Sequence, residues 1–138
     1  MATDLQTVKL HGYSFPDWQF TFNLASATAK TDRAGPMTLD TSGPNQMKIG
    51  ADDTPIDGVL LTYEDRTIEG IKVGTVSLKF AAKFLIKAAD ALAVGDTAIC
   101  AGGGEVRKWI TGVDAAVPAR AANVVTEVTG GYATIVKQ

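Results

Sequence analysis

Alternation between apolar and polar residues is the feature of this sequence that most constrains its fold. From Trp18 to Leu24 every even position is apolar and every odd position is polar. Successive side chains of a β-strand point to opposite faces, so this pattern predicts a half-buried strand. The same period runs from Val76 to Ala88, where lysines at every fourth position offer a helix as the alternative. A helix would place Ile86 among those lysines, so we predict one long strand that bends.

Turn signals that contain glycine or proline divide the rest of the chain into strand-length pieces. Ala, Gly, Thr and Val make up 62 of the 138 residues, a composition that suits strands and close backbone approach. We therefore predict a single all-β (mostly β) domain over residues 1–138, a small barrel or sandwich of many short strands. We predict one short helix at most, and 88–93 is the segment where the sequence allows it, because helix propensity is high there. Further strands are expected at 36–39, 47–50, 58–63, 68–73, 97–100, 105–110, 122–128 and 132–137.

Scarce residue types exclude several kinds of site. The lone Cys100 rules out an intramolecular disulfide framework, and the lone His11 cannot complete a Cys/His zinc cage. A formal net charge of -2 argues against a nucleic-acid binder, which needs a surplus of Lys and Arg. No apolar run approaches the roughly 18 residues of a membrane span, and the chain does not begin like a secretory signal. We expect a soluble protein made in the cytoplasm, with no cofactor, no metal, no membrane and no direct nucleic-acid partner.

Motifs that look like catalytic or ligand-binding sites have simpler interpretations. Gly102–Gly104 precedes a strand-like segment and not a helix, so it predicts a hairpin tip instead of a phosphate-binding loop. Asp52, Asp53 and Asp57 lack the spacing of a calcium loop and indicate a solvated turn. Cys100 has no basic neighbour in sequence, which indicates a buried, inert thiol. No catalytic pair is visible, so we predict that the protein is not an enzyme.

Charge is unevenly distributed along the chain. Residues 40–70 carry seven acidic and two basic residues, whereas residues 71–138 carry five acidic and eight basic ones. The acidic middle is either a solvated loop face or a charged rim that positions a partner. A basic stripe, either a solvated strand face or a contact for an acidic partner, consists of Lys72, Lys79, Lys83 and Lys87.

The segment from 35 to 61 carries a distinctive series of motifs. It contains Gly-Pro-Met-Thr-Leu-Asp-Thr-Ser at 35–42, Met-Lys-Ile at 47–49, an acidic loop at 52–55 and Ile-Asp-Gly-Val-Leu-Leu at 56–61. This segment resembles the lambda-type head decoration (capsid cement) proteins of tailed bacteriophages, in which a Pro-x-x-Leu-Asp strand leads through a polar loop to a Gly-Val/Ile-Leu strand. The chain departs from that form by a longer C-terminal side and by strand patterns in residues 1–24, where the family has a loose arm.

The resemblance implies a β-tulip-like fold and a structural role in the virion. Family members form homotrimers that bind the major capsid protein at local three-fold positions, on the outer surface of the expanded head, and stabilise the shell. By this analogy, trimer or capsid contacts are expected at Pro36, Leu39 and Asp40. Contacts are also expected at Trp18 and Phe20, because aromatic residues are concentrated at 13–22 and such residues are frequent at subunit interfaces.

Residues 1–15 form a second candidate for capsid contact. Leu5, Val8 and Leu10 give this segment a short apolar pattern. A terminal segment of this kind can add a strand to an exposed capsid sheet edge. An ordinary edge strand of the domain explains the same pattern equally well.

Two other function classes stay open. A tail-tube or head-completion subunit of a phage would share a β-rich sequence of this kind. A carbohydrate-binding β domain would use Tyr13, Trp18 and Trp109 as stacking platforms for sugar rings.

Overall fold

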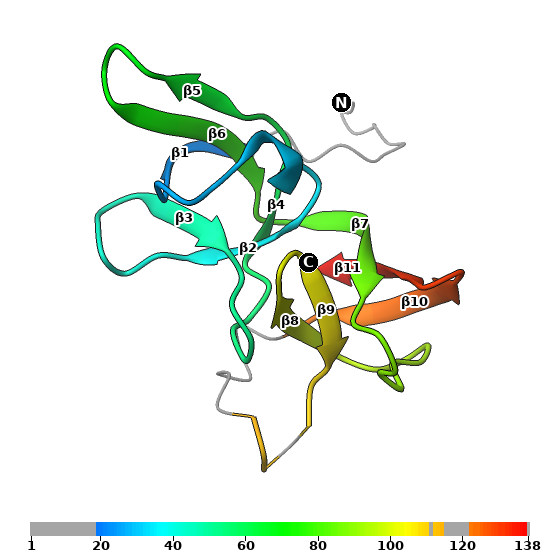
Figure 1. The fold of residues 1–138 in the computed structure, drawn as a ribbon. Helices are drawn as coiled ribbons and strands as arrows, with labels where there is room; N and C mark the ends of the chain where they lie inside the picture. Colours follow the sequence, from blue (N-terminus) through cyan, green and yellow to red (C-terminus); the bar gives the residue numbers. More distant parts are fainter. Residues whose placement is uncertain (1–18, 111, 115–121, 138) are drawn as a thin grey trace, which may run out of the picture.

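Every regular element of the structure except one short 3-10 helix is a β-strand, which confirms the predicted all-β fold (Figure 1). The structure, a computed structural model, describes residues 19–110, 112–114 and 122–137. No α-helix occurs within these ranges. The elements are β1 (Gln19–Leu24), η3 (Lys30–Asp32), β2 (Pro36–Leu39), β3 (Gln46–Ile49), β4 (Gly58–Leu60), β5 (Glu64–Arg66), β6 (Ile71–Ser77), β7 (Phe80–Ile86), β8 (Ala98–Gly102), β9 (Glu105–Lys108), β10 (Val124–Thr129) and β11 (Tyr132–Lys137).

Five of these strands close into a small mixed barrel. β1 pairs in parallel with β3, and antiparallel pairs continue the barrel through β2 and β4 to β6. β6 then pairs with β1, from Gln19 opposite Ser77 to Asn23 opposite Val73, and completes the ring. β5 extends outward from the barrel on the first residues of β6. Closure gives each barrel strand a partner on both sides, which protects its backbone hydrogen-bonding groups.

Gly74 allows β6 to pair with three neighbouring strands. One edge of β6 pairs with β1, and the other edge pairs first with β5 and then with β4. A Cβ atom on Gly74 would lie 2.3 Å from the Thr62 carbonyl oxygen and 2.9 Å from Leu60 Cδ1. The change of partner along β6 therefore requires a residue without a side chain.

The barrel interior is filled by large apolar side chains from different strands. Leu24, Met37, Met47, Leu60 and Val76 form one buried cluster, and none of them is more than 5% exposed. Because these side chains come from β1, β2, β3, β4 and β6, their packing holds the whole ring together.

A second sheet of five strands follows, in the order β10-β11-β7-β9-β8. Its core contains Phe80 and Phe84, whose rings meet edge to face with centroids 5.7 Å apart. Ile56 and Val59, from the barrel part of the chain, belong to the same buried cluster. The barrel and the second sheet are therefore packed against each other through a shared core.

The side chain of Asn123 joins the two edges of the second sheet. Its Oδ1 accepts a hydrogen bond from the backbone N–H of Ala98, and its Nδ2 donates to the Ala98 carbonyl oxygen, both at 2.9 Å. An amide side chain thus takes the place of a peptide group beside β8. The N–H of Val125 donates to the Asp96 carbonyl oxygen at 2.9 Å, which extends this link from β10.

The long alternating segment at 76–88 is divided between the two sheets. β6 ends at Ser77 and β7 begins at Phe80, so the predicted bend is a complete break and the prediction of one continuous strand is wrong. The alternation itself is confirmed within β7, where the even positions are buried or half-buried and the odd ones are exposed. It fails at the two ends of the segment, because Ser77 is buried and Ala88 is exposed. The break exists because β6 closes the barrel while β7 belongs to the other sheet.

The structure forms no helix at 88–93, in agreement with the prediction of one short helix at most, because Ala89 has a φ of +66° in a turn closed by a hydrogen bond from Asp90 N–H to the Lys87 carbonyl oxygen. A left-handed residue cannot continue a right-handed helix. β5 escapes prediction because its three residues are charged and exposed, without apolar alternation. The other predicted strands are all present, with ends shifted by up to four residues.

Replacement of Gly74 by alanine should destabilise the protein strongly. The added methyl group would overlap a backbone carbonyl oxygen, and overpacking of this kind costs about 1 to 3 kcal/mol or more. We expect the midpoint of urea unfolding to fall while the slope stays the same. Ala81→Val, which adds bulk at an exposed position of β7, is the control and should change stability by less than about 0.5 kcal/mol. A Gly74→Ala variant as stable as the wild type would contradict this role of Gly74.

Candidate functional site

Phe20 is the first of the predicted contact residues that the structure places. It lies in β1 and is 45% exposed, with its ring edge to face against Phe22 at a centroid distance of 6.4 Å. Nearly half of this side chain is therefore open to a partner. The predicted contact residues that lie outside the described ranges are Leu5, Val8, Leu10 and Trp18, together with the whole 1–15 segment.

Leu39 at the end of β2 is exposed, whereas the predicted contact residues Pro36 and Asp40 on either side of it are buried. Leu39 is 44% exposed, whereas Pro36 is fully buried and Asp40 is only 7% exposed. Pro36 sits opposite Val59 in the barrel wall, so it shapes the barrel instead of offering a surface. A contact at this segment stays a prediction, and Leu39 is the side chain through which β2 can make it.

Asp40 organises the turn between β2 and β3. Its carboxylate accepts hydrogen bonds from the backbone N–H of Ser42 at 3.0 Å, from the Ser42 hydroxyl at 2.7 Å and from Gln46 Nε2 at 2.7 Å. These hydrogen bonds, with the positive charge of Lys48 nearby, lower the pKa of Asp40. The carboxylate thereby fixes the backbone that follows Leu39.

Asp57 connects the two halves of the 35–61 segment. Its Oδ2 accepts hydrogen bonds from the backbone N–H of Leu39 at 2.9 Å and from the Thr38 hydroxyl at 3.1 Å. The interpretation of Asp52, Asp53 and Asp57 as a solvated turn is therefore wrong for Asp57. It is confirmed for Asp52, which lies in an exposed turn with its side chain 60% exposed. Its hydrogen bond from Arg107 could not be predicted, because the two residues are far apart in the sequence.

Arg107, in β9, ties the second sheet to two loops. Its Nη1 and Nη2 donate to the two carboxylate oxygens of Asp114 at 3.1 and 2.7 Å, and its Nε donates to Asp52 at 2.8 Å. Asp114 is almost buried and also accepts the backbone N–H of Ile110 at 2.7 Å. Hydrogen bonds from Arg107 lower the pKa of Asp114, and the same bonds raise the pKa of Arg107. The cluster holds the chain beyond β9 in place.

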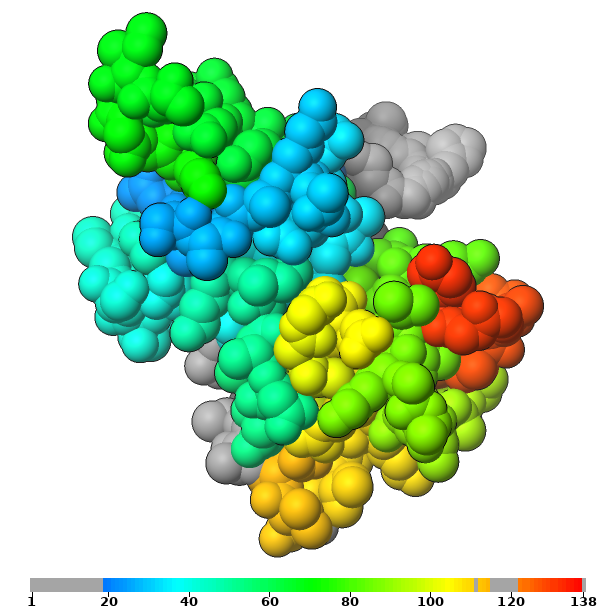
Figure 2. Space-filling view, viewed as in Figure 1, coloured from blue at the N-terminus to red at the C-terminus, as the bar shows by residue number. Residues whose placement is uncertain are grey.

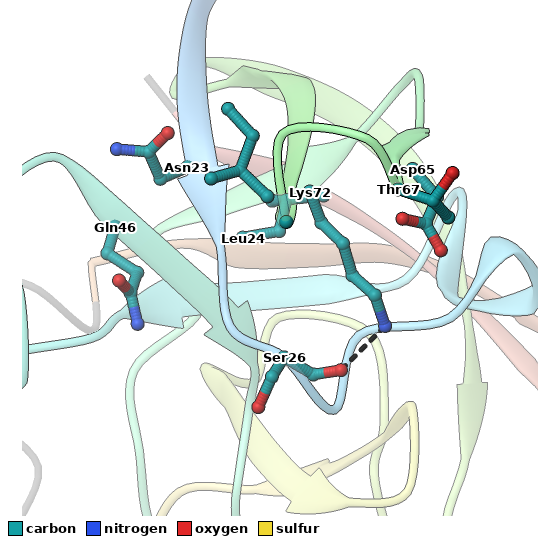
Figure 3. A pocket seen from close by; sticks show the side chains of 9 residues that line it. Asn23, Leu24, Ser26, Gln46, Asp65, Thr67 and Lys72 are labelled. Atoms are coloured by element: carbon teal, nitrogen blue, oxygen red, sulfur yellow. Dashed lines mark hydrogen bonds between the residues drawn. The ribbon is translucent and has the colours of Figure 1, made fainter.

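An open hollow of about 620 Å³ lies between the β5–β6 hairpin, β1 and β3 (Figure 3). Lys72 crosses it and donates from Nζ to the carbonyl oxygens of Ser26 at 2.6 Å and Thr28 at 2.8 Å. The ammonium group is therefore engaged with the backbone and braces the segment after β1 against β6. The residues that line the hollow are Asn23, Leu24, Ser26, Gln46, Asp65, Thr67, Gly70, Ile71 and Lys72.

Two interpretations of sequence motifs are confirmed by the second sheet. Gly102–Gly104 forms the tip of the hairpin between β8 and β9, with all three residues at positive φ. Cys100 is fully buried, and desolvation raises the pKa of its thiol to about 12. The thiol is thus protonated and inert at neutral pH.

Trp109 is the one residue of the sugar-binding alternative that the structure describes. It packs against Ile99 and its indole Nε1 is buried without a hydrogen-bond partner. The ring therefore belongs partly to the packing of β8 and β9. Tyr13 and Trp18 lie outside the described residues, so the sugar-binding alternative stays a prediction.

Comparison with known proteins adds no relative. No protein-family model matches the chain, and neither a search of curated proteins nor a search of solved structures returned a match. Within the part of the chain that the structure describes, no three His, Cys, Asp or Glu residues are grouped to hold a metal ion. None of the described helices has the length and apolar character to cross a membrane.

The exchange Asp114→Asn should destabilise the protein only where the carboxylate is ionised. Because the pKa of Asp114 is lowered in the folded state, ionised Asp114 stabilises the fold above its ordinary pKa, and this contribution is lost as pH falls through the folded-state pKa. The difference in unfolding free energy between wild type and Asp114→Asn, measured by urea denaturation, should be largest at neutral pH and shrink below about pH 4.

The same comparison in an Arg107→Met background is the control for this pH dependence. Without the guanidinium, most of the difference between Asp114 and its asparagine variant should disappear at neutral pH, because the two residues act as one pair. A pH dependence that persists unchanged in the Arg107→Met background would assign the effect to the Ile110 N–H instead.

Proposed function

We propose that this protein is a capsid decoration protein of a tailed bacteriophage. It is made in the host cytoplasm and binds, as a homotrimer, to the outer surface of the mature, expanded head. Its partner there is the major capsid protein at local three-fold positions. Its role in the virion is structural: it stabilises the shell, uses no cofactor and is not an enzyme.

The observation that carries this proposal is the pairing of the two motif strands on which the resemblance rests. β2 contains the Pro-Met-Thr-Leu motif and β4 contains the Gly-Val-Leu motif. The two strands are neighbours in the barrel, with Pro36 opposite Val59 and Met37 opposite Gly58. Asp57, just before β4, hydrogen-bonds back to Leu39 at the end of β2. The motifs thus form one structural unit, which supports the resemblance beyond the order of residues in the sequence.

Exposed apolar side chains on the barrel give such a protein a means of binding a shell. Phe20, Leu39 and Leu61 are each between 42% and 45% exposed. Complete burial of a side chain of this size contributes about 1.5 to 3 kcal/mol, so partial burial of a few of them gives a modest contact. Repetition of a modest contact three times in a trimer raises the total affinity strongly, provided that all three sites engage together.

Stabilisation of the head follows from a difference in affinity. A protein that binds the expanded shell better than the unexpanded one shifts the balance toward the expanded shell by that difference. Bound trimers also oppose any opening of the shell that would release them. The proposed function therefore requires selectivity for the expanded form as well as tight binding.

Selective decoration of expanded heads is the measurement that tests the proposal. Purified protein is mixed with expanded, undecorated heads of tailed phages and with unexpanded proheads of the same phages, and bound protein is quantified after sedimentation. We expect saturable binding to expanded heads only, with higher resistance of those heads to heat. Equal binding to both forms, or rings of six or more copies in solution, would contradict the proposal, and such rings would favour a tail-tube subunit.

Leu39→Asp should lower the affinity for expanded heads by about tenfold or more, the equivalent of about 1.4 kcal/mol. A charge at this exposed position cannot be buried against the shell without a large desolvation cost. Val94→Asp is the matched control, because Val94 is 64% exposed and lies near the second sheet. Unchanged binding by Leu39→Asp would remove β2 from the capsid contact.

A further inference from the structure

The hollow beside Lys72 lies at the rim of the barrel, where β1 and β6 part. Pairing of these strands ends at Asn23 opposite Val73, and the chain after β1 turns at residues 25–28. In the space-filling view the β5–β6 hairpin, in green, stands out beside the blue atoms of β1 and the residues after it (Figure 2). The mouth of a β-barrel is one of the usual positions of small-molecule sites, whose volumes are roughly 300 to 1,000 Å³. The position of this hollow and its volume of about 620 Å³ therefore suit a small ligand.

One face of the β5–β6 hairpin lines the hollow with both signs of charge. Asp65 lies opposite Lys72 in register, so the two side chains project from the same face of the hairpin. Thr67, two residues after Asp65, also lines the hollow, and Figure 3 shows both on the same side of Lys72. The carboxylate and the ammonium group cancel in charge. This part of the hollow is therefore polar without a net charge.

Lys72 is held in place and keeps one hydrogen-bond donor for a ligand. Its ammonium group has three N–H donors. Two of them are used by the carbonyl oxygens of Ser26 and Thr28, at 2.6 and 2.8 Å. No other described residue accepts a hydrogen bond from this group, and no ion pair joins it to Asp65. The third N–H is thus fixed in direction and available.

Three further polar side chains around the hollow are available as well. Within residues 19–110, 112–114 and 122–137, the hydroxyls of Ser26 and Thr67 and the carboxylate of Asp65 make no hydrogen bond with another residue. A carboxylate only accepts, an ammonium group only donates, and a hydroxyl does both. A ligand that satisfies all of them must itself donate and accept at closely spaced positions. Neighbouring hydroxyl groups on a sugar ring have this property.

The polar groups converge at the Asp65 end of the hollow and not at its other end. Asn23 lies opposite Gln46, and Leu24 lies opposite Met47. Because neighbouring residues of a strand point to opposite faces, Asn23 and Gln46 face away from the barrel interior that Leu24 and Met47 fill. The hollow thus extends around the end of β1. A first sugar ring fits the Asp65 end, and a second ring is needed to reach Asn23.

We propose that this hollow binds a neutral saccharide, with ring hydroxyls placed between Asp65 and Lys72. Asp65 accepts hydrogen bonds from the sugar, the third N–H of Lys72 donates one, and the hydroxyls of Ser26 and Thr67 complete the site. The ligand is neutral because an anion would be repelled by Asp65 and a cation by Lys72. The inference goes beyond the proposed function, since a sugar can enter the hollow without a trimer or a capsid. It also uses none of the aromatic residues of the sugar-binding alternative.

An NMR titration of the isotope-labelled full chain tests the site. The probes are glucose, galactose and mannose as free sugars, and mannan as a neutral polysaccharide. We expect at least one probe to shift the amide resonances of Thr67, Gly70 and Lys72 in a saturable manner. Tighter binding of mannan than of mannose would identify the end of a glycan chain as the ligand, whereas equal binding would identify a single sugar.

Two results of this titration would overturn the proposal. One is the absence of any saturable shift at these three amides with all four probes. The other is a set of shifts confined to the surroundings of Trp109, which would place sugar binding at an aromatic residue instead.

The variant Asp65→Ala should lower the affinity for the bound sugar by about tenfold, because a hydrogen bond to a charged group is lost. Glu64→Ala is the matched control. Glu64 precedes Asp65 in β5, points to the other face and lies 3.3 Å from Arg66, so its loss should change the affinity by less than about twofold. Both positions are exposed, and the urea midpoints of the two variants should match that of the wild type. An equal effect of the two substitutions, or none from Asp65→Ala, would overturn the assignment of Asp65.

Salt and inorganic phosphate test the neutral character of the ligand. Because the site and the sugar carry no net charge, the affinity should change by less than about twofold when NaCl is raised to about 0.5 M. Inorganic phosphate should leave the amides of Thr67, Gly70 and Lys72 unshifted. Tighter binding of phosphate than of every sugar at these amides, lost in added salt, would overturn the proposal and make Lys72 the centre of an anion site.

Discussion

Closure of the barrel at β6 is the constraint on which the rest of the structure depends. This one strand bonds to β1 along one edge and to β5 and β4 along the other, and the change of partner is possible because Gly74 has no side chain to displace the Thr62 carbonyl. The part of β6 that extends beyond β4 pairs with β5, and the short break after β6 leads directly to β7 in the second sheet. The strand that completes the barrel thus also holds the projecting strand β5 and connects the barrel to the second sheet.

Polar side chains inside the fold serve to fix loops against strands. Asp57 holds the end of β2, Arg107 holds the chain after β9, and Lys72 braces the segment that follows β1. Each of these groups bonds to backbone or to an opposite charge, as expected of polar atoms removed from water. The rigid loops that result keep exposed apolar side chains such as Leu39 in fixed positions. Fixed positions reduce the entropy lost on binding, which suits the proposed structural role in an assembly.

Much of the fold could be predicted from local sequence pattern, and the failures have a common physical cause. Alternation identified β7 because one of its faces is buried, and it identified β1 although only Leu24 at the end of its apolar face is buried. Turn residues marked the ends of most strands. β5 could not be predicted from the sequence, because a strand that projects from the barrel has no buried face and therefore no alternation of apolar and polar residues. The ion pair between Arg107 and Asp52 could not be predicted either. The two residues are far apart in the chain, and arginine and aspartate are common on protein surfaces whether or not they form an ion pair.

The sequence by itself determined that the chain is a β protein of short strands, because side-chain period and turn chemistry are local properties of neighbouring residues. It also located the paired motifs of β2 and β4 that underlie the proposed function. Only the tertiary structure decided that five strands close into a barrel, that the 76–88 segment passes from one sheet to the other, and which charged residues form pairs. Those outcomes depend on which strands become neighbours, and pairing between distant strands is decided by the packing of the whole core.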